Sequence, residues 1–406
     1  CTYKEQMDES FGNMESEKEG RMRPEIIFMP LGGGQRVGAS CYYLKIGDSN
    51  ILLDAGIGVD QGMEFEPDFH CLLTSPFMQS MGQINQIFIS HAHMDHVGDL
   101  LKVMNQANYA NVYMTEITKT LTQYQLYDRL FIGNREKDER TRLATKGLLE
   151  KITPVSFMKT LDFGKYRVTF YPAGHIPGAM MVLFEVGRKK ILYTGDYSIH
   201  HTVLTQKCIP PKGMDIDTVI LCGLHAKHPD YVKKSDRMFQ QIGYALHVVN
   251  DTGQSVLCKV PQLSKGIEFL KKLNDWNRTG IPIYIDESLM NVVHKMEQLS
   301  VPILNQYNRV MDMNKGRPKE AHIYLTSDRN TRWVGPYKLL NANFSLHEDF
   351  SEMKEFLKLL NPRQAMVVHC DKEKSVFDET IEQEMMRDGE CRTQFTFAEE
   401  NEIYQL

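Results

Sequence analysis

The chain has 406 residues, of which 42% are hydrophobic and 24% charged, and its formal net charge is −5. A chain of this length is too long to fold around one ordinary hydrophobic core, which favours two domains. The composition is typical of a soluble globular protein. The chain contains no apolar run of the ~20 residues that a membrane helix needs, so we expect no membrane association. The small negative charge excludes a globally basic nucleic-acid-binding protein but not a local basic groove. The eight cysteines form no CxxC pair, which favours reduced thiols and a cytoplasmic location.

The first half of the chain is predicted to alternate short strands with polar turns. Residues 1–23 are polar and acidic, and we expect them to form a disordered tail. A helix is predicted at 96–105, and the charged stretch 115–150 is expected to be mostly helical. The predicted strands of this half span 26–28, 41–44, 51–53, 86–90, 167–171, 181–186 and 190–193.

From about residue 217 the pattern changes to a regular alternation of strands and helices, which is the signature of a parallel α/β unit. The predicted strands are 218–222, 255–260, 281–285 and 321–326, and the predicted helices are 235–249, 264–276 and 288–299. The chain then returns to a helix at 350–360, a strand at 364–369, a helix at 374–388 and a β segment at 392–406.

The stretch SHAHMDHVGDL, residues 90–100, places His91, His93, Asp95 and His96 directly after an apolar strand. Each imidazole and carboxylate needs a polar partner when it is buried, so four of them in one turn make a poor core. Imidazole nitrogens and carboxylate oxygens are ligands that zinc prefers. The stretch therefore predicts a metal site, with room for one ion or two.

Further candidate ligands follow other predicted strands. His175 lies in Ala173-Gly174-His175, Asp196 in Thr194-Gly195-Asp196, and His369 follows Val367-Val368. Each of these residues alone would be read as an ordinary core or surface group. Taken together they repeat one placement at the ends of strands, which favours a shared metal centre.

These motifs resemble a known family. LLDAG at 52–56, HxHxDH at 91–96, AGHIPGA at 173–179, TGDYS at 194–198 and VVHC at 367–370 match the metallo-β-lactamase fold in order and spacing. FSLHED at 344–349 and SVLCKVPQLSKGIEFLKKL at 255–273 are similar to motifs of the β-CASP nucleases within that fold, which include ribonuclease J and the endonuclease of pre-mRNA 3′-end processing.

The resemblance implies an α/β fold in which a metallo-β-lactamase αββα sandwich carries a compact β-CASP-like α/β insertion. The sandwich would be split in sequence into 24–205 and 341–406, and the insertion would span 206–340. One departure from the family is expected to matter. An acidic residue usually follows the strand at 218–222 and orients the general acid, but here Gly223 stands there and no carboxylate follows until Asp230.

The resemblance also implies roles for individual residues. It assigns two divalent metal ions, zinc with manganese as the alternative, to the ligands His91, His93, His175, Asp95, His96, His369 and the bridging Asp196. Asp54 would orient ligands, and His347 would be the general acid. The catalytic group would therefore comprise Asp54, Asp95, Asp196 and His347.

The predicted function is metal-dependent phosphodiester hydrolysis, with single-stranded RNA as the substrate and a hydroxide activated by two metal ions as the nucleophile. The RNA would lie in the cleft between the two domains, and either endo or exo cleavage fits. The alternatives are hydrolysis of a small phosphodiester or thioester, and a non-catalytic, metal-bound partner subunit of a nuclease complex. Assembly as a homodimer or as a subunit of a complex is also expected.

Overall fold

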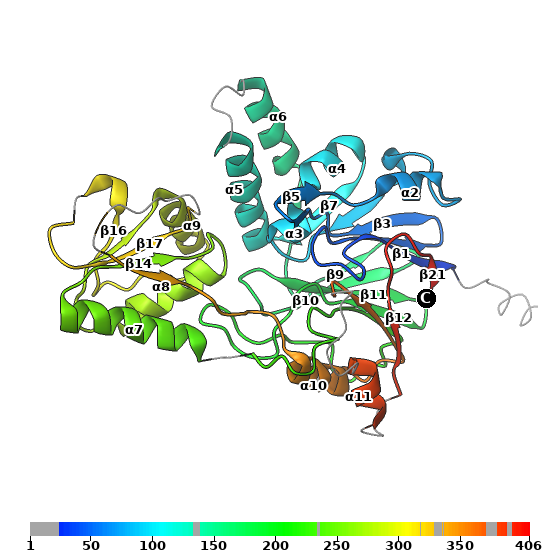
Figure 1. Cartoon of the computed structure of the whole chain (residues 1–406). Coiled ribbons are helices and arrows are strands. Elements are labelled where there is room, and N and C mark those ends of the chain that lie inside the picture. Colours follow the sequence, from blue (N-terminus) through cyan, green and yellow to red (C-terminus); the bar gives the residue numbers. More distant parts are fainter. Residues whose placement is uncertain are drawn as a thin grey trace, which may run out of the picture.

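The protein is represented by a computed structural model that describes residues 24–132, 139–233, 236–316, 318–328, 335, 337–370, 380–387 and 392–406. The predicted tail at 1–23 and the beginning of the predicted helix 374–388 lie outside the described residues. Two large sheets stacked face to face form one unit, and a smaller sheet with its own helices forms a second unit beside it (Figure 1).

The first large sheet has the strand order β21-β1-β2-β3-β6-β7-β8. The strands from β21 to β3 pair antiparallel, and those from β3 to β8 pair parallel. The turn between β2 and β3 is a hairpin in which Gly47 adopts a left-handed backbone (φ 60°), and Leu44 pairs with Ile51 across it. The strands span Ile26–Gly32 (β1), Cys41–Ile46 (β2), Ser49–Leu53 (β3), Gln86–Phe88 (β6), Asn111–Thr115 (β7), Thr153–Val155 (β8) and Tyr404–Gln405 (β21). A small hairpin, Gly58–Asp60 (β4) with Met63–Phe65 (β5), lies apart from it.

The second large sheet has the order β20-β19-β13-β12-β11-β10-β9. The segment β9 to β12 is an antiparallel meander, whereas β13, β19 and β20 add in parallel. The strands span Thr160–Asp162 (β9), Arg167–Pro172 (β10), Met180–Val186 (β11), Lys189–Tyr193 (β12), Thr218–Cys222 (β13), Gln364–Val368 (β19) and Gln394–Phe397 (β20). The sheet thus combines strands from distant parts of the chain.

The two sheets bury a common apolar layer between them. Phe88 of the first sheet lies at its centre and contacts Phe170 and Phe184 of the second sheet, with ring centroids 6.0 and 5.5 Å apart. Aromatic pairs in such offset or edge-on arrangements stabilise a core beyond the apolar area that they bury. This layer fixes the two sheets relative to each other, and with them the loops at their ends.

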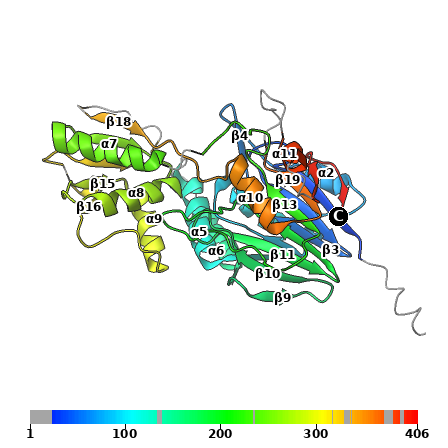
Figure 2. The ribbon, with the colours of Figure 1, turned by 90° about the horizontal axis from the view of Figure 1, so that it is seen from below.

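Helices cover the outer face of each sheet, which confirms the expected αββα arrangement. In Figure 2, α10 and α11 lie against β13 and β19 of the second sheet. The helices over the first sheet are Phe69–Thr74 (α2), Met94–Val97 (α3), Leu100–Gln106 (α4), Glu116–Ile132 (α5) and Glu139–Glu150 (α6), with the short 3₁₀ helix Met81–Gln83 (η1) nearby. Those over the second sheet are Phe350–Leu360 (α10) and Ile381–Arg387 (α11).

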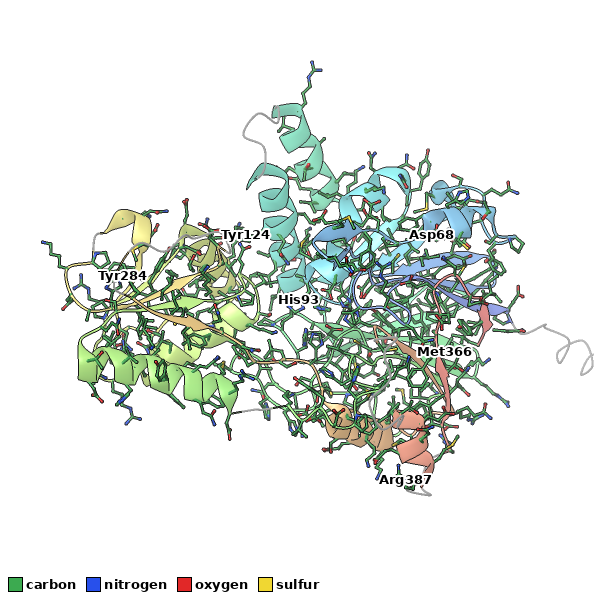
Figure 3. All side chains as sticks on the ribbon, in the orientation of Figure 1. Asp68, His93, Tyr124, Tyr284, Met366 and Arg387 are labelled. Carbon is green, nitrogen blue, oxygen red and sulfur yellow. The ribbon has the colours of Figure 1, made fainter. Side chains whose placement is uncertain are left out.

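Within the described residues, the second unit is a five-stranded parallel sheet of order β16-β15-β17-β14-β18 with three α-helices and one short 3₁₀ helix. It contacts the sandwich through α5, whose Tyr124 hydroxyl donates a hydrogen bond to the Ser288 carbonyl of α9 at 3.0 Å (Figure 3). Its strands are Val256–Lys259 (β14), Ile283–Ile285 (β15), Val310–Asp312 (β16), Ile323–Thr326 (β17) and Lys338–Asn341 (β18). Its helices are Arg237–Thr252 (α7), Lys265–Trp276 (α8), Glu287–Gln298 (α9) and the 3₁₀ helix Met313–Lys315 (η2).

The structure corrects the place of one predicted strand. The expected insertion 206–340 would count Thr218–Cys222 as its first strand, but β13 pairs with β12 and β19 inside the second large sheet. At the other end, Lys338–Asn341 pairs with β14 and so belongs to the small sheet. We therefore propose that the inserted unit spans about Arg237–Asn341.

The predicted helix 96–105 is also wrong in detail, because it is divided into α3 and α4 at Gly98 and Asp99. A Cβ atom on Gly98 would lie 2.5 Å from Ile57 Cγ1, and the Asp99 amide donates to the Ala55 carbonyl at 2.8 Å instead of continuing α3. Within the described part of the chain, no helix is long and apolar enough to cross a membrane.

Candidate metal centre

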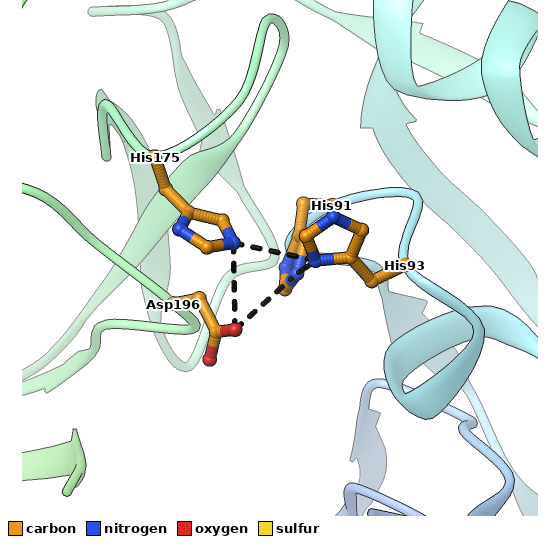
Figure 4. A group of neighbouring side chains, drawn as sticks. All are labelled: His91, His93, His175 and Asp196. Atoms are coloured by element: carbon orange, nitrogen blue, oxygen red, sulfur yellow. Dashed lines mark hydrogen bonds and ion pairs between the residues drawn. The ribbon is translucent and has the colours of Figure 1, made fainter. Parts of the chain in front are cut away.

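The site lies where strands of both large sheets end. His91 and His93 follow β6, His175 follows β10, Asp196 follows β12 and His369 follows β19. In Figure 4, His175 and Asp196 project from loops of the second sheet toward His91 and His93 from the loop after β6. The loops bend sharply at these positions, and His175 and His369 have left-handed backbone angles (φ 56° and 51°). Such angles are uncommon for residues other than glycine and are concentrated at functional sites.

The first group of donors consists of His91, His93, His175 and Asp196, whose ligand atoms all lie within 4.8 Å of one another. His93 Nδ1 is 3.0 Å from His91 Nε2 and 3.3 Å from His175 Nε2. Two nitrogens bound to one tetrahedral zinc at 2.0–2.1 Å would be separated by about 3.3 Å. The three nitrogens are therefore spaced as ligands of a single ion.

The second group consists of Asp95, His96 and His369. His96 Nε2 and His369 Nε2 face the same Asp95 oxygen, at 3.9 and 3.7 Å. Asp196 lies between the two groups, because its Oδ2 is 3.5 Å from His175 Nε2 and its Oδ1 is 3.4 Å from His96 Nε2. This geometry suits one carboxylate shared by two neighbouring ions.

The chemistry of these residues fits bound metal ions. His96 Nε2 and Asp196 Oδ2 are buried and have no hydrogen-bond partner among the residues that the structure describes, and such atoms are costly unless something binds them. Burial lowers the pKa of His91 and lowers that of His93 to about 3, so both imidazoles are neutral, as metal binding requires. Burial acts the same way on His96, but the carboxylates of Asp196, Asp95 and Asp54 raise its pKa well above the usual value. A metal ion could supply the positive charge that these carboxylates favour.

Asp54 supports the candidate ligands through hydrogen bonds. It is fully buried, has a left-handed backbone (φ 61°) and accepts the Ser90 amide at 2.6 Å on Oδ1. Its Oδ2 accepts the Ser90 hydroxyl at 2.7 Å and the Tyr193 hydroxyl at 2.5 Å, and it lies 2.7 Å from His96 Nδ1. Hydrogen bonds to the rear nitrogen of a ligating histidine fix its orientation and tautomer.

Several supporting residues were missed by sequence reasoning. The Ser90 hydroxyl also contacts His91 Nδ1 at 2.9 Å, and the Ser40 hydroxyl contacts His369 Nδ1 at 3.0 Å. Ser90 and Tyr193 lie beside predicted ligands in the sequence, and this proximity was their one available signal. Ser40 offered none, because it reaches His369 from the far end of the chain.

His347 lies at the edge of the same centre. Its Nδ1 is 3.4 Å from Asp196 Oδ2 and its side chain is 23% exposed, so it is the one predicted catalytic histidine that faces both the site and solvent. It borders a groove of about 870 Å³ that is lined by residues of the sandwich and of the inserted unit, among them Arg237, Lys265, His225 and Tyr231. His225 and Tyr231 stack on each other with ring centroids 3.8 Å apart.

The structure changes which residue stands where the family usually has an acidic side chain after Thr218–Cys222. A Cβ atom on Gly223 would lie 2.4 Å from Val367 Cγ1, so this position points into the core and not toward His347. The residue that faces the site from the end of β13 is Cys222, whose thiol lies 2.8 Å from Asp196 Oδ1.

Comparison with known proteins agrees with this geometry. Residues 34–205 match the sequence model of the Metallo-beta-lactamase superfamily, so the chain contains a domain of that superfamily. Within it, the chain is related to endoribonucleases of the β-CASP family, as the motifs predicted.

The relatives include Endoribonuclease ysh-1 of Neurospora crassa, 29% identical over 312 residues that cover 72% of this chain and 35% of that protein. Endoribonuclease ysh1 of Schizosaccharomyces pombe is 30% identical over 296 residues, which cover 69% of this chain and 37% of the relative. Integrator complex subunit 11 of Danio rerio is 28% identical over 363 residues, 85% of this chain and 58% of the relative. The chain thus spans about a third of the length of the first two relatives.

A solved structure, that of a protein of unknown function from Enterococcus faecalis V583, superposes with a TM-score of 0.62. It is 11% identical, and the match covers 94% of this chain and 100% of that one. This likeness supports the fold over nearly the whole chain.

Proposed function

We propose that this protein is a metal-dependent phosphodiester hydrolase that cleaves single-stranded RNA. The observation that carries the proposal is the pair of adjoining donor groups around Asp196, with His347 beside them at the edge of an open groove. The names of the relatives, which are endoribonucleases, support RNA as the substrate. The assignment of ligands and catalytic residues is part of this proposal.

In the proposed arrangement, His91, His93 and His175 hold one ion, Asp95, His96 and His369 hold the other, and Asp196 bridges them. Zinc fits the nitrogen-rich donor set, and manganese is the alternative. Two bound divalent ions would lower the pKa of a water and offset charge that develops on the phosphoryl group. Asp54 keeps His96 oriented through Nδ1.

His347 is proposed to protonate the leaving oxygen of the substrate. It is the partly exposed histidine next to Asp196, so its ring can contact both the reacting phosphate and the solvent. A histidine in this role typically contributes about 10²–10⁴-fold to the rate.

The groove is proposed to bind the RNA strand. Arg237 and Lys265 can contact backbone phosphates, and the stacked pair of His225 and Tyr231 offers an aromatic surface for a base. Combined phosphate contacts and base stacking are typical of proteins that bind single strands without strict sequence preference.

The test is hydrolysis of labelled single-stranded RNA, DNA of the same sequence and a small phosphodiester by wild type, His347→Ala and His70→Ala. His70 is an exposed histidine on α2 and serves as the matched control. We expect RNA to be cleaved fastest, His347→Ala to lower kcat by about 10²–10⁴-fold with unchanged metal content, and His70→Ala to match wild type. Wild-type kcat in His347→Ala would refute its role, and hydrolysis of the small substrate alone would refute RNA.

Two further points remain proposals. Because one relative is named as a complex subunit, we propose that this chain acts as a subunit of a complex, with a homodimer as the alternative. Mass photometry of the purified protein and of the protein recovered with its partners from cells would distinguish the two. A cytoplasmic location also stays a prediction, and imaging of the tagged chain would test it.

A further inference from the structure

A third donor group overlaps the two already described. Asp196, His369 and Cys222 place ligand atoms within 4.8 Å of one another, and all three are buried. The Cys222 thiol donates to Asp196 Oδ1 at 2.8 Å, the same oxygen that lies 3.4 Å from His96 Nε2. Sulfur therefore lies on the side of Asp196 that faces the second ion, and the mechanism proposed above gives it no role.

The fold holds this thiol in place. Cys222 ends β13, which is flanked by β12 on one side and β19 on the other. The backbone at Cys222 is fixed by hydrogen bonds. The Cys222 amide donates to the Thr194 hydroxyl at 3.0 Å, and the Gly223 amide donates to the Val368 carbonyl at 2.8 Å. The paired strands β13 and β19 thus position both the Cys222 thiol and His369.

A second observation points to a ligand at this place. The His96 side chain is 1% exposed, and its Nε2 has no hydrogen-bond partner in the described part of the chain. It faces Asp95 Oδ2 and Asp196 Oδ1, the carboxylate oxygen to which the thiol also points. One imidazole nitrogen thus faces two carboxylates, and one of these carboxylates also accepts the thiol. Imidazole, carboxylate and thiol groups are the donors that a transition-metal ion binds.

We propose that Cys222 is an additional ligand of the second metal ion, beside Asp95, His96, His369 and Asp196, and that its sulfur makes this position selective for zinc over manganese. The proposal rests on the metal centre of the proposed function. On binding, the sulfur–metal bond replaces the S–H bond, and the thiol proton passes to solvent. Thiolate sulfur favours zinc, whereas manganese and magnesium favour oxygen ligands.

Cobalt(II) substitution tests the proposal directly, because a cobalt–thiolate bond gives an intense charge-transfer absorption in the near ultraviolet that nitrogen and oxygen ligands do not. Apo-protein is titrated with cobalt(II) as wild type, Cys222→Ser and Cys258→Ser. Cys258 is a buried thiol of β14 in the inserted unit and serves as the matched control. We expect the band to appear with the second equivalent in wild type and Cys258→Ser, and to be absent in Cys222→Ser.

Competition with chelators gives an independent measurement. Cys222→Ser should weaken the second zinc by about 10–100-fold and manganese by much less, in line with the loss of a ligand that prefers zinc. Cys222→Asp supplies an oxygen in place of sulfur, and it should shift the preference toward manganese even if the serine variant is unstable. Equal losses for zinc and manganese in Cys222→Ser would overturn the selectivity.

The outcomes separate this inference from the proposed function. Wild-type protein that binds two cobalt ions without a charge-transfer band overturns the role of Cys222, and RNA cleavage by that protein would leave the function intact. A band that depends on Cys222 supports the ligand assignment, whether or not the protein cleaves RNA.

Discussion

Asp54→Asn tests how strongly a buried carboxylate controls the second metal ion of the proposed centre. Asn tolerates the left-handed backbone at this position (φ 61°), so the substitution leaves the chain path unchanged. The Ser90 amide can only donate, so the new carbonyl oxygen must face it and the new NH₂ must face the Oδ2 partners. The hydroxyls of Ser90 and Tyr193 can rotate to accept from the NH₂, but His96 Nδ1 loses its acceptor.

The loss at His96 sets the expected magnitude. A hydrogen bond to a charged group contributes about 1.5–3 kcal/mol. Without an acceptor at Nδ1, neutral His96 favours the tautomer with its proton on Nε2, the nitrogen that faces the second ion. We therefore expect the affinity for the second ion to fall by about 10–100-fold, which corresponds to about 1.4–2.8 kcal/mol.

Chelator competition that resolves the first and second equivalents of zinc measures this change. Asp60→Asn is the matched control, because its carboxylate is 65% exposed and pairs with Arg36 at the surface. The first equivalent should bind nearly as in wild type, since the contact of Asp54 with the first group runs through the Ser90 hydroxyl. An unchanged second affinity in a folded Asp54→Asn protein would refute the reasoning, as would an equal loss in Asp60→Asn.

Three further changes test other parts of the structure. Burial raises the pKa of Glu348 from 4.5 to about 8, although the charge of Lys233 lowers it. The folded state therefore binds this proton more tightly than the unfolded state, and the free energy of unfolding should fall as pH rises from about 4.5 to about 8. Urea unfolding across that range should show a smaller fall for Glu348→Gln, and an identical pH profile would contradict the assignment. Phe88→Ala should lower the free energy of unfolding, measured by the same method, by about 3–5 kcal/mol, because it leaves a cavity at the centre of the layer between the sheets. A loss below about 1 kcal/mol would show that neighbouring side chains fill this cavity. Lys265→Gln should weaken RNA binding and reduce the slope of log K against log salt by about 0.7, the value for one single-strand phosphate contact, and an unchanged slope would place the RNA elsewhere.

Local patterns in the sequence predicted most elements of the fold. The strands that became β2, β3, β10, β11 and β12 have strong apolar patterns and turn residues beside them, and neighbours in sequence pair with each other. The place of β13 could not be predicted this way. Thr218–Cys222 is buried throughout, as a strand of either unit would be, and its partners β12 and β19 are decided by contacts between distant segments.

The candidate site shows the same limit at the level of single residues. The histidine cluster at 91–96 could be predicted as a site from the sequence, because polar side chains that follow a buried strand need partners. Whether Cys222 or Gly223 faces the site depends on the exact end of β13. Neighbouring residues of a strand point to opposite faces, so an error of one residue assigns the wrong side chain to the site. Ser40 was beyond reach, since only the folded chain brings it to His369.

The position of β19 has a consequence for how the protein is made. This strand lies between β13 and β20, yet it comes late in the chain, after the entire inserted unit. While residues before Gln364 are being synthesised, the second sheet lacks an inner strand and the metal centre lacks His369, whose amide later bonds to the Gly33 carbonyl. Because domains fold as their residues emerge, the nascent chain cannot complete its candidate metal centre until residues 364–369 have been synthesised. The order of strands thereby delays completion of the candidate metal centre until the whole inserted unit has been synthesised.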